Sequence, residues 1–213
     1  MNTKLNRGGN LEISQKELSA ISELVNIGLG RGASILNTLL SSHIKLHAPI
    51  IKFLSMVELE SELAYYREVE LFSVEMGFSG EIDGNMKLVF THDCASKLVH
   101  ALTGDLEIDE DIDTLRAGTL NEVGNIVINS IIGAISNELC FSLRYSVPNY
   151  MQGSYDSIIS SSSSDLQEAV LHVRAHFVVE QLDLRGDLMI FLETNSLRNI
   201  STAICDLEKR LGE

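Results

Sequence analysis

Two glutamate–asparagine pairs have the same internal spacing in this chain. Glu23 stands three residues before Asn26, and Glu122 stands three residues before Asn125. Residues three apart lie on one face of a helix. A carboxylate can pair with a positive group of a partner, and a planar amide offers a hydrogen-bond donor and an acceptor together. Each pair could therefore orient a charged group and a polar ligand such as water.

The first pair is followed by three glycines, Gly28, Gly30 and Gly32, inside a stretch whose apolar spacing predicts a helix. Glycine costs about 1 kcal/mol relative to alanine inside a helix, so three of them would weaken a face that only met solvent. Small residues beside a polar pair would let another surface come close. The helix phase favours Gly28 and Gly32 facing a neighbouring helix and Gly30 facing the same side as Glu23 and Asn26.

Supporting residues extend each polar face by one turn on either side. Ser19 and Gly30 flank the first pair, and Gly118 and Asn129 stand at the equivalent places around the second. Ser19, Gly30 and Asn129 are therefore predicted to support the two pairs.

The elements that carry these residues repeat in the same order. We expect a helix from Ser14 to about residue 39, a strand over 43–51, a short helix over 55–63, a hairpin over 69–91 turning at Asp83–Gly84, and a helix over 93–103. An acidic stretch, 105–113, follows. We then expect a helix over 113–138, a strand over 140–148, a Ser-rich loop over 154–165, a hairpin turning at Arg185–Gly186, and a final helix from about residue 195. At Ser14, a glutamate three residues later predicts a capping box.

Constant offsets indicate an internal duplication. Each Glu–Asn pair is 99 residues from its counterpart, as is Pro49 from Pro148, whereas Gly84 and Gly186 are 102 apart. We expect a single α+β domain with pseudo-two-fold symmetry, made of repeats over about 13–104 and 112–206. The two prolines are expected to mark where the strand after each long helix ends.

Composition excludes several classes of protein. The 213 residues are 45% hydrophobic, which is typical of a packed globular chain, and a net charge of −14 argues against nucleic-acid binding. The start of the chain lacks the apolar core of a signal peptide, and the longest apolar run, 126–135, is too short to cross a bilayer. Three widely spaced cysteines are typical of reduced thiols. We expect a soluble, cytoplasmic protein without membrane insertion.

Other motifs do not support chemistry. Gly28, Gly30 and Ala33 match a dinucleotide fingerprint only superficially, because a helix is already under way there. His172 and His176 would share one face of a strand, too far apart to hold one metal, and His43 and His47 flank another strand, so all are expected to be solvated. We find no metal cluster, and an unrelated small-molecule hydrolase would lack a nucleophile.

Together these residues resemble a known signature. The pattern Ser19-x3-Glu23-x2-Asn26-x22-Pro49 is similar to that of the CheC–CheX–FliY phosphatases of bacterial chemotaxis, which has Asp or Ser at the first position. The second copy, Glu122-x2-Asn125-x22-Pro148, departs from it because Gly118 occupies that position. The resemblance spans residues 13–206, and two motif copies look like the CheC type.

The resemblance implies a fold and an activity. Its fold is a central, largely antiparallel sheet of about six strands with the two long helices on one face. Its activity is hydrolysis of the aspartyl phosphate of a CheY-like response regulator, with Mg²⁺ held by the receiver and no cofactor or metal bound by this chain. Asn26 and Asn125 would orient the water, and Glu23 and Glu122 would pair with the receiver's lysine. The alternative is a non-catalytic regulator that binds the deamidase CheD or a phosphorylated receiver.

Overall fold

The computed structural model describes residues 13–40, 44–103, 112–159, 169–179 and 182–211. The elements in chain order are α1 (Gln15–Leu40), β1 (Ile44–Leu54), α2 (Met56–Glu62), η1 (Ala64–Tyr66), β2 (Leu71–Ser79), β3 (Gly84–Thr91), α3 (His92–Thr103), α4 (Ile112–Leu139), β4 (Arg144–Tyr145), β5 (Asn149–Gly153), α5 (Tyr155–Ile158), β6 (Ala169–Val179), β7 (Leu182–Leu192) and α6 (Thr194–Leu211). Most of the acidic stretch 105–113, the serine run 160–164 and His43 lie outside the described residues.

One antiparallel sheet joins both halves of the chain. The strand order is β1-β6-β7-β3-β2-β4, and β5 pairs with β2 beside β4, so seven strands occupy six positions. Exchanging β1 with β4 and β5, β2 with β6, and β3 with β7 gives the same strand order, counted from the other edge of the sheet. Such an arrangement is what a duplicated unit would produce, although the repeat boundaries themselves stay a prediction.

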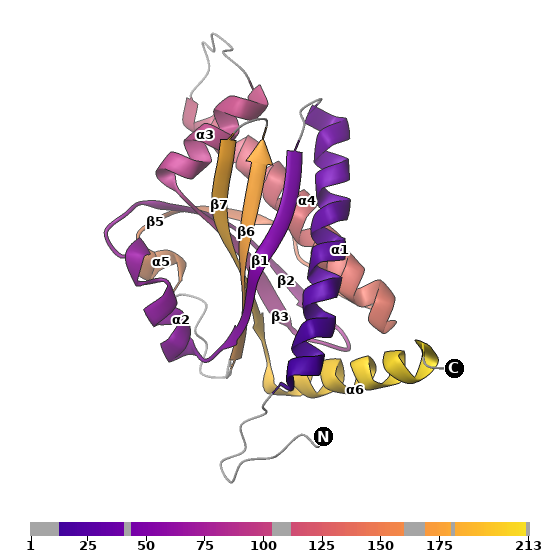
Figure 1. Ribbon diagram of the computed structural model, residues 1–213. Coiled ribbons are helices and arrows are strands. Elements are labelled where there is room, and N and C mark those ends of the chain that lie inside the picture. Colours follow the sequence, from indigo (N-terminus) through magenta and orange to yellow (C-terminus); the bar gives the residue numbers. More distant parts are fainter. Residues whose placement is uncertain (1–12, 41–43, 104–111, 160–168, 180–181, 212–213) are drawn as a thin grey trace.

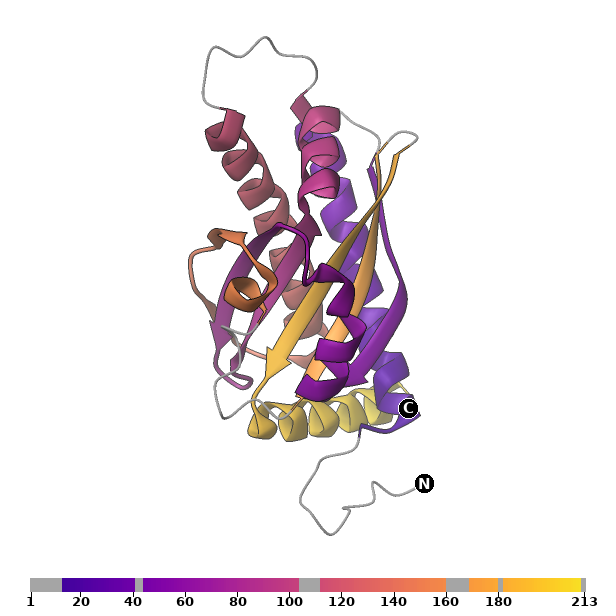
Figure 2. The same ribbon diagram turned by 90° about the vertical axis from the view of Figure 1, so that its left-hand side faces the viewer.

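Helices cover both faces of the sheet. The long helices α1 and α4 lie on one face, whereas α2, η1 and α5 lie on the other (Figures 1 and 2). The larger apolar core joins α1, α4, α3 and α6 to the first face, and a smaller core lies under α2, η1 and α5. The expected α+β class, with an antiparallel sheet and two long helices on one face, is confirmed.

The start of α1 follows the local sequence. The Ser14 backbone N–H donates to Glu17 Oε2 over 2.7 Å, and the Glu17 N–H donates to Ser14 Oγ over 3.2 Å, which is the predicted capping box. A second box, between Ser55 and Glu58, begins α2. Both helices therefore begin where short-range hydrogen bonding places them.

Three predictions about strands are wrong. Gly186 is not in a turn but lies within β7 opposite Ala175, where a side chain would collide with the Phe90 and Phe177 rings. The 140–148 segment forms only the two-residue strand β4, and Pro148 lies between it and β5. Pro49 does not end its strand either.

At Pro49 the strand continues through an irregularity. The β1–β6 register shifts between His47 and Ile50, so Ala48 and Pro49 have no partner in the ladder. Proline has no N–H to give to a ladder, which accounts for a bulge at this position. The bulge leaves the Ala48 N–H to find another acceptor.

Candidate functional site

The outer face of α1 presents the first Glu–Asn pair to solvent. Glu23 and Asn26 are both exposed, as are Ser19 and Gly30, while the opposite side of the helix is buried in the larger core. No neighbouring atom lies within 4 Å of the place where a Gly30 side chain would begin. The predicted residues of this first site therefore lie together on an open surface.

The Asn26 amide is bonded at both ends. Its Nδ2 donates to the Ser22 carbonyl over 2.9 Å, and its Oδ1 accepts from the Ala48 N–H over 3.2 Å. That N–H is the one freed by the bulge before Pro49, so the helix asparagine completes the backbone hydrogen bonding of β1. This contact gives the spacing of 22 residues between Asn26 and Pro49 a physical reason that the sequence pattern had not revealed.

The second pair lies on α4 with different contacts. Glu122 is exposed and Asn125 is partly exposed. Asn129, one turn later, donates from Nδ2 to Asn125 Oδ1 over 2.6 Å. Gly118 leaves the first position of the motif without a side chain, and no neighbouring atom lies within 4 Å of the place where one would begin. The second site therefore holds its asparagine through a side chain rather than through the backbone of a strand.

The two helices cross in close contact at the glycines. A side chain on Gly28 would begin 2.4 Å from the Ile131 Cα, and one on Gly32 would begin 3.4 Å from the Ser130 Cβ. Gly28 and Gly32 therefore serve the packing of α1 on α4, as the helix phase predicted. The two helices run in opposite directions (Figure 1), and Asn26 and Asn125 each precede the Gly28–Ile131 contact in their own helix.

Charge and geometry limit what these sites can do. Each offers one carboxylate and one amide on an exposed helix face, which suits contact with a cation and with water. Within the described residues, no group of three or more histidine, cysteine, aspartate or glutamate side chains could hold a metal ion.

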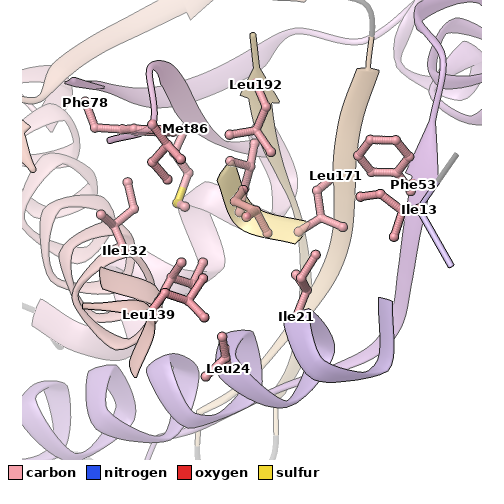
Figure 3. Close-up of a pocket in the computed structure, with 14 residues that line it drawn as sticks. Ile13, Ile21, Leu24, Phe53, Phe78, Met86, Ile132, Leu139, Leu171 and Leu192 are labelled. Carbon is pink, nitrogen blue, oxygen red and sulfur yellow. The ribbon is translucent and has the colours of Figure 1, made fainter. Parts of the chain in front are cut away.

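A cavity beneath α1 is not a site for polar chemistry. It has a volume of about 30 Å³ and lies among apolar side chains of α1, α4, α6 and five strands, including Ile21, Leu24, Ile132 and Leu171 (Figure 3). All of its lining side chains are hydrocarbon or thioether groups. A void of this size and lining is a packing defect of the core rather than a ligand site.

The prediction for His172 is wrong. This side chain is fully buried, and its Nε2 lies 2.7 Å from Asp187 Oδ1. Tyr65 and Tyr66 each donate a hydroxyl hydrogen bond to Asp187 Oδ2 over 2.5 Å, and Arg174 Nε donates to Oδ1 over 3.3 Å. The strand alternation placed His172, Arg174 and His176 on one face, but only the packing of η1 on that face made it polar and closed.

This network shifts the pKa values of Asp187, Tyr65 and Tyr66. Burial alone would raise the pKa of Asp187, but the hydrogen bonds from His172, Tyr65 and Tyr66 outweigh it and lower the pKa to about 2. Burial, together with the nearby Asp187 charge, raises the pKa of Tyr65 to about 12 and raises that of Tyr66 still further. Asp187 is therefore a charged structural group near neutral pH.

Two comparisons with known proteins both find chemotaxis phosphatases. A family model described as chemotaxis phosphatase CheX matches residues 72–171. The CheY-P phosphatase CheC of Bacillus subtilis (strain 168) is 27% identical over 163 residues, which are 75% of this chain and 78% of that protein. The chain is similar to chemotaxis phosphatases. The CheX match includes Glu122, Asn125 and Pro148, whereas the first site lies outside it.

Solved structures share the fold. The crystal structure of Thermotoga maritima FliY has a TM-score of 0.72 at 17% identity and covers 92% of this chain and all of its own. The FliM middle domain from H. pylori has a TM-score of 0.63 at 12% identity and covers 90% of this chain and 99% of its own. Together these findings support the CheC–CheX–FliY resemblance. Within the described residues, no helix is long and apolar enough to cross a membrane.

Proposed function

We propose that this protein hydrolyses the aspartyl phosphate of a CheY-like receiver domain. The observation that carries the proposal is the Glu–Asn pair at the surface of each of two adjacent helices, at equivalent positions of the chain. The proposal includes a CheC-type protein of one duplicated domain that acts in the cytoplasm.

The asparagines would orient the attacking water. An amide oxygen can accept a proton of the water while the amide nitrogen donates to a phosphoryl oxygen, which holds the water in line. Asn26 and Asn125 take this role in the two sites. Such positioning needs little binding energy, since a 100-fold acceleration corresponds to about 2.7 kcal/mol.

The glutamates would fix the docking register. A receiver active site carries a lysine and Mg²⁺ beside the phosphoryl group, so Glu23 or Glu122 can pair with that lysine as the surfaces meet. The metal belongs to the substrate, and this chain supplies no ligand to it. Gly30 leaves space for the receiver's loops beside Asn26, while Ser19 and Asn129 border the contact.

Several observations support the phosphatase proposal. The relative with 27% identity is named a CheY-P phosphatase, and the CheX family model spans the second site. The Asn26–Ala48 hydrogen bond also links the asparagine to the residue before Pro49, the proline of the family signature. These findings favour a CheY-like receiver as the partner.

A second candidate is a non-catalytic regulator that binds CheD or a phosphorylated receiver. The observation that favours it is the state of Asn26, whose amide is already bonded to Ser22 and Ala48. To orient water, this amide would have to use its remaining hydrogen and lone pair or exchange a partner. A site that only binds has no such requirement.

Phosphate release from a phosphorylated receiver tests the proposal. The receiver would be phosphorylated with a small phosphodonor, and its decay would be followed with and without this protein. Faster decay that rises with protein concentration supports the phosphatase. Tight binding of the phosphorylated receiver with unchanged decay contradicts it and supports the regulator.

A further inference from the structure

A second pocket lies on the sheet face opposite α1 and α4. Its volume is about 370 Å³, and its walls include Tyr65 of η1, Thr91 at the end of β3, and Arg174, Arg185 and Asp187 of β6 and β7. Figure 2 shows this face of the sheet with α2 in front of it. Pockets of this size accommodate small molecules rather than proteins.

The negative charge in this pocket is already compensated. Both carboxylate oxygens of the buried Asp187 accept hydrogen bonds, from His172 and Arg174 on Oδ1 and from Tyr65 and Tyr66 on Oδ2. Asp187 therefore acts as an anchor that orients its neighbours. Arg174 is held in place because its Nε donates to Asp187 Oδ1. The Arg174 guanidinium also lies 5.8 Å from the centre of the Tyr65 ring.

Arg174 is paired with Asp187 and Glu62, whereas Arg185 supplies a cation that lacks a matching anion. It is exposed, and within the described part of the chain it has no ion pair or hydrogen bond. Its place in β7 is opposite His176, and Arg174 is opposite Asp187, so the two arginines occupy the same face of neighbouring strands. An unmatched arginine is unexpected in a chain with a net charge of −14.

The donors around this pocket come from the three neighbouring strands β6, β7 and β3. Arginine guanidinium groups bind oxyanions through paired N–H donors. The Thr91 hydroxyl accepts from the Cys94 N–H over 3.3 Å, which leaves its own proton to donate to a ligand. Since α3 begins beside Thr91, the positive end of the helix dipole adds to the field of the arginines. Two guanidinium groups and a hydroxyl together match the several acceptor oxygens of a phosphate group.

We propose that this pocket binds a small phosphate-bearing ligand, held by Arg174, Arg185 and Thr91. The site is independent of the Glu–Asn pairs, because it lies on the other face of the sheet. Its ligand would be a phosphate monoester or free phosphate, which share the dianionic group that the arginines recognise. The proposal stands or fails separately from phosphatase activity.

Titration calorimetry with inorganic phosphate at constant ionic strength tests this inference. We expect saturable binding to the intact protein and at least tenfold weaker binding to the Arg185→Gln variant. The matched control is Arg198→Gln, which removes an exposed arginine of α6 far from the pocket and should leave phosphate binding unchanged. The Asn26→Ala/Asn125→Ala double variant should also bind phosphate normally, which separates this pocket from the proposed phosphatase sites.

The same titration with succinate tests selectivity for phosphate. Weaker binding of succinate supports a site for a tetrahedral anion, whereas equal or tighter binding overturns the phosphate assignment. No saturable binding of phosphate, or equal loss in both arginine variants, overturns the pocket itself. Replacing phosphate by a phosphate monoester then distinguishes the two sources, since tighter binding of the ester indicates that the remaining volume also contacts ligand.

Discussion

The two Glu–Asn sites have the same spacing but hold their asparagines differently. Asn26 accepts a hydrogen bond from the backbone of β1 and donates to the backbone of α1. Asn125 accepts from the side chain of Asn129. A backbone partner cannot rotate away, whereas a side chain on an exposed helix can, so the Asn26 amide is the more constrained of the two.

The strands beside the sites differ as well. Next to the first site, β1 continues through its bulge from Ile44 to Leu54. In the second half the chain leaves the sheet after Tyr145 and rejoins it at Asn149, and Val147, the counterpart of Ala48, is 85% exposed. A motif read from sequence therefore defines which residues are presented, while the neighbouring strand defines how firmly they are held.

The largest expected effect is on receiver dephosphorylation. Under the proposed function, replacing Asn26 and Asn125 together with alanine should return the decay of a phosphorylated receiver to its own rate, because no amide remains to orient water. The two single variants measure each site separately. Asn26 already donates to Ser22 and accepts from Ala48, whereas Asn125 accepts from Asn129 and keeps its amide hydrogens for the phosphoryl group, so we expect Asn26→Ala to retain the larger share of activity. Asn137→Ala, an exposed asparagine elsewhere on α4, should leave the rate unchanged; full activity in the double variant would contradict the assignment.

The second prediction concerns Asp187, a buried group of the sheet on which both long helices pack. Asp187→Asn should lower the free energy of unfolding by roughly 3 kcal/mol, because four hydrogen-bond donors lose a buried negative acceptor. Urea denaturation measures this loss. Since Asp187 lies on the far face of the sheet, any fall in activity should be the same in the Asn26→Ala and Asn125→Ala backgrounds, and a fall confined to one background would contradict a shared role.

The pH dependence of stability sharpens this prediction. The pKa of Asp187 is lowered from 3.8 to about 2 in the folded protein, so the unfolded chain takes up this proton first as the solution is acidified. The stabilisation, about 2 kcal/mol for such a shift, is fully present above pH 4 and is lost as the pH falls towards 2. Asp187→Asn should reduce this acid sensitivity. If the free energy of unfolding falls equally between pH 4 and 2 in the variant and in the unchanged protein, Asp187 is excluded as the source of the acid sensitivity.

The third prediction compares two glycines of α1 through one chemical change. Gly28→Ala places a methyl group 2.4 Å from the Ile131 backbone and should destabilise the protein by roughly 1–3 kcal/mol. Gly30→Ala meets no atom within 4 Å and should stabilise it by about 0.5–1 kcal/mol through helix propensity. Thermal denaturation of both variants decides the matter, and equal effects would show that the helix crossing does not depend on Gly28.

The smallest expected effect concerns Asn129. Under the proposed function, Asn129→Ala in the Asn26→Ala background should slow dephosphorylation at the second site about fivefold, which corresponds to about 1 kcal/mol and is typical of one hydrogen bond. The same change with Asn26 intact and Asn125 replaced should have no effect. A slowing there would mean that Asn129 acts through something other than the Asn125 amide.

Much of the site could be predicted because it is local. The capping residues Ser14 and Glu17 and the apolar stripe predicted α1, and the three-residue spacing placed Glu23 beside Asn26 on its outer face. The helix phase also separated Gly28 from Gly30 correctly. These features depend on contacts within one or two turns, which a single sequence displays directly.

The errors lie where distant segments meet. Gly186 matched a turn by composition, yet it belongs to a longer strand because Phe90 and Phe177 occupy the space beside it. His172 alternated like a surface residue, yet η1, more than 100 residues earlier in the chain, closes over Asp187, its hydrogen-bond partner. Neither contact has a signature in the residues nearby.

By itself, the sequence determined the two long helices, the repeated Glu–Asn spacing and the side of the helix on which each pair lies. Helical periodicity and capping act over a few residues, so they can be predicted from the sequence. Only the tertiary structure decided what each asparagine bonds to, which residues of α4 the glycines of α1 contact, and that an arginine-lined pocket forms on the other face of the sheet. Those features arise from the bulge in β1, the crossing of α1 with α4 and the packing of η1, which bring together residues that no local pattern connects.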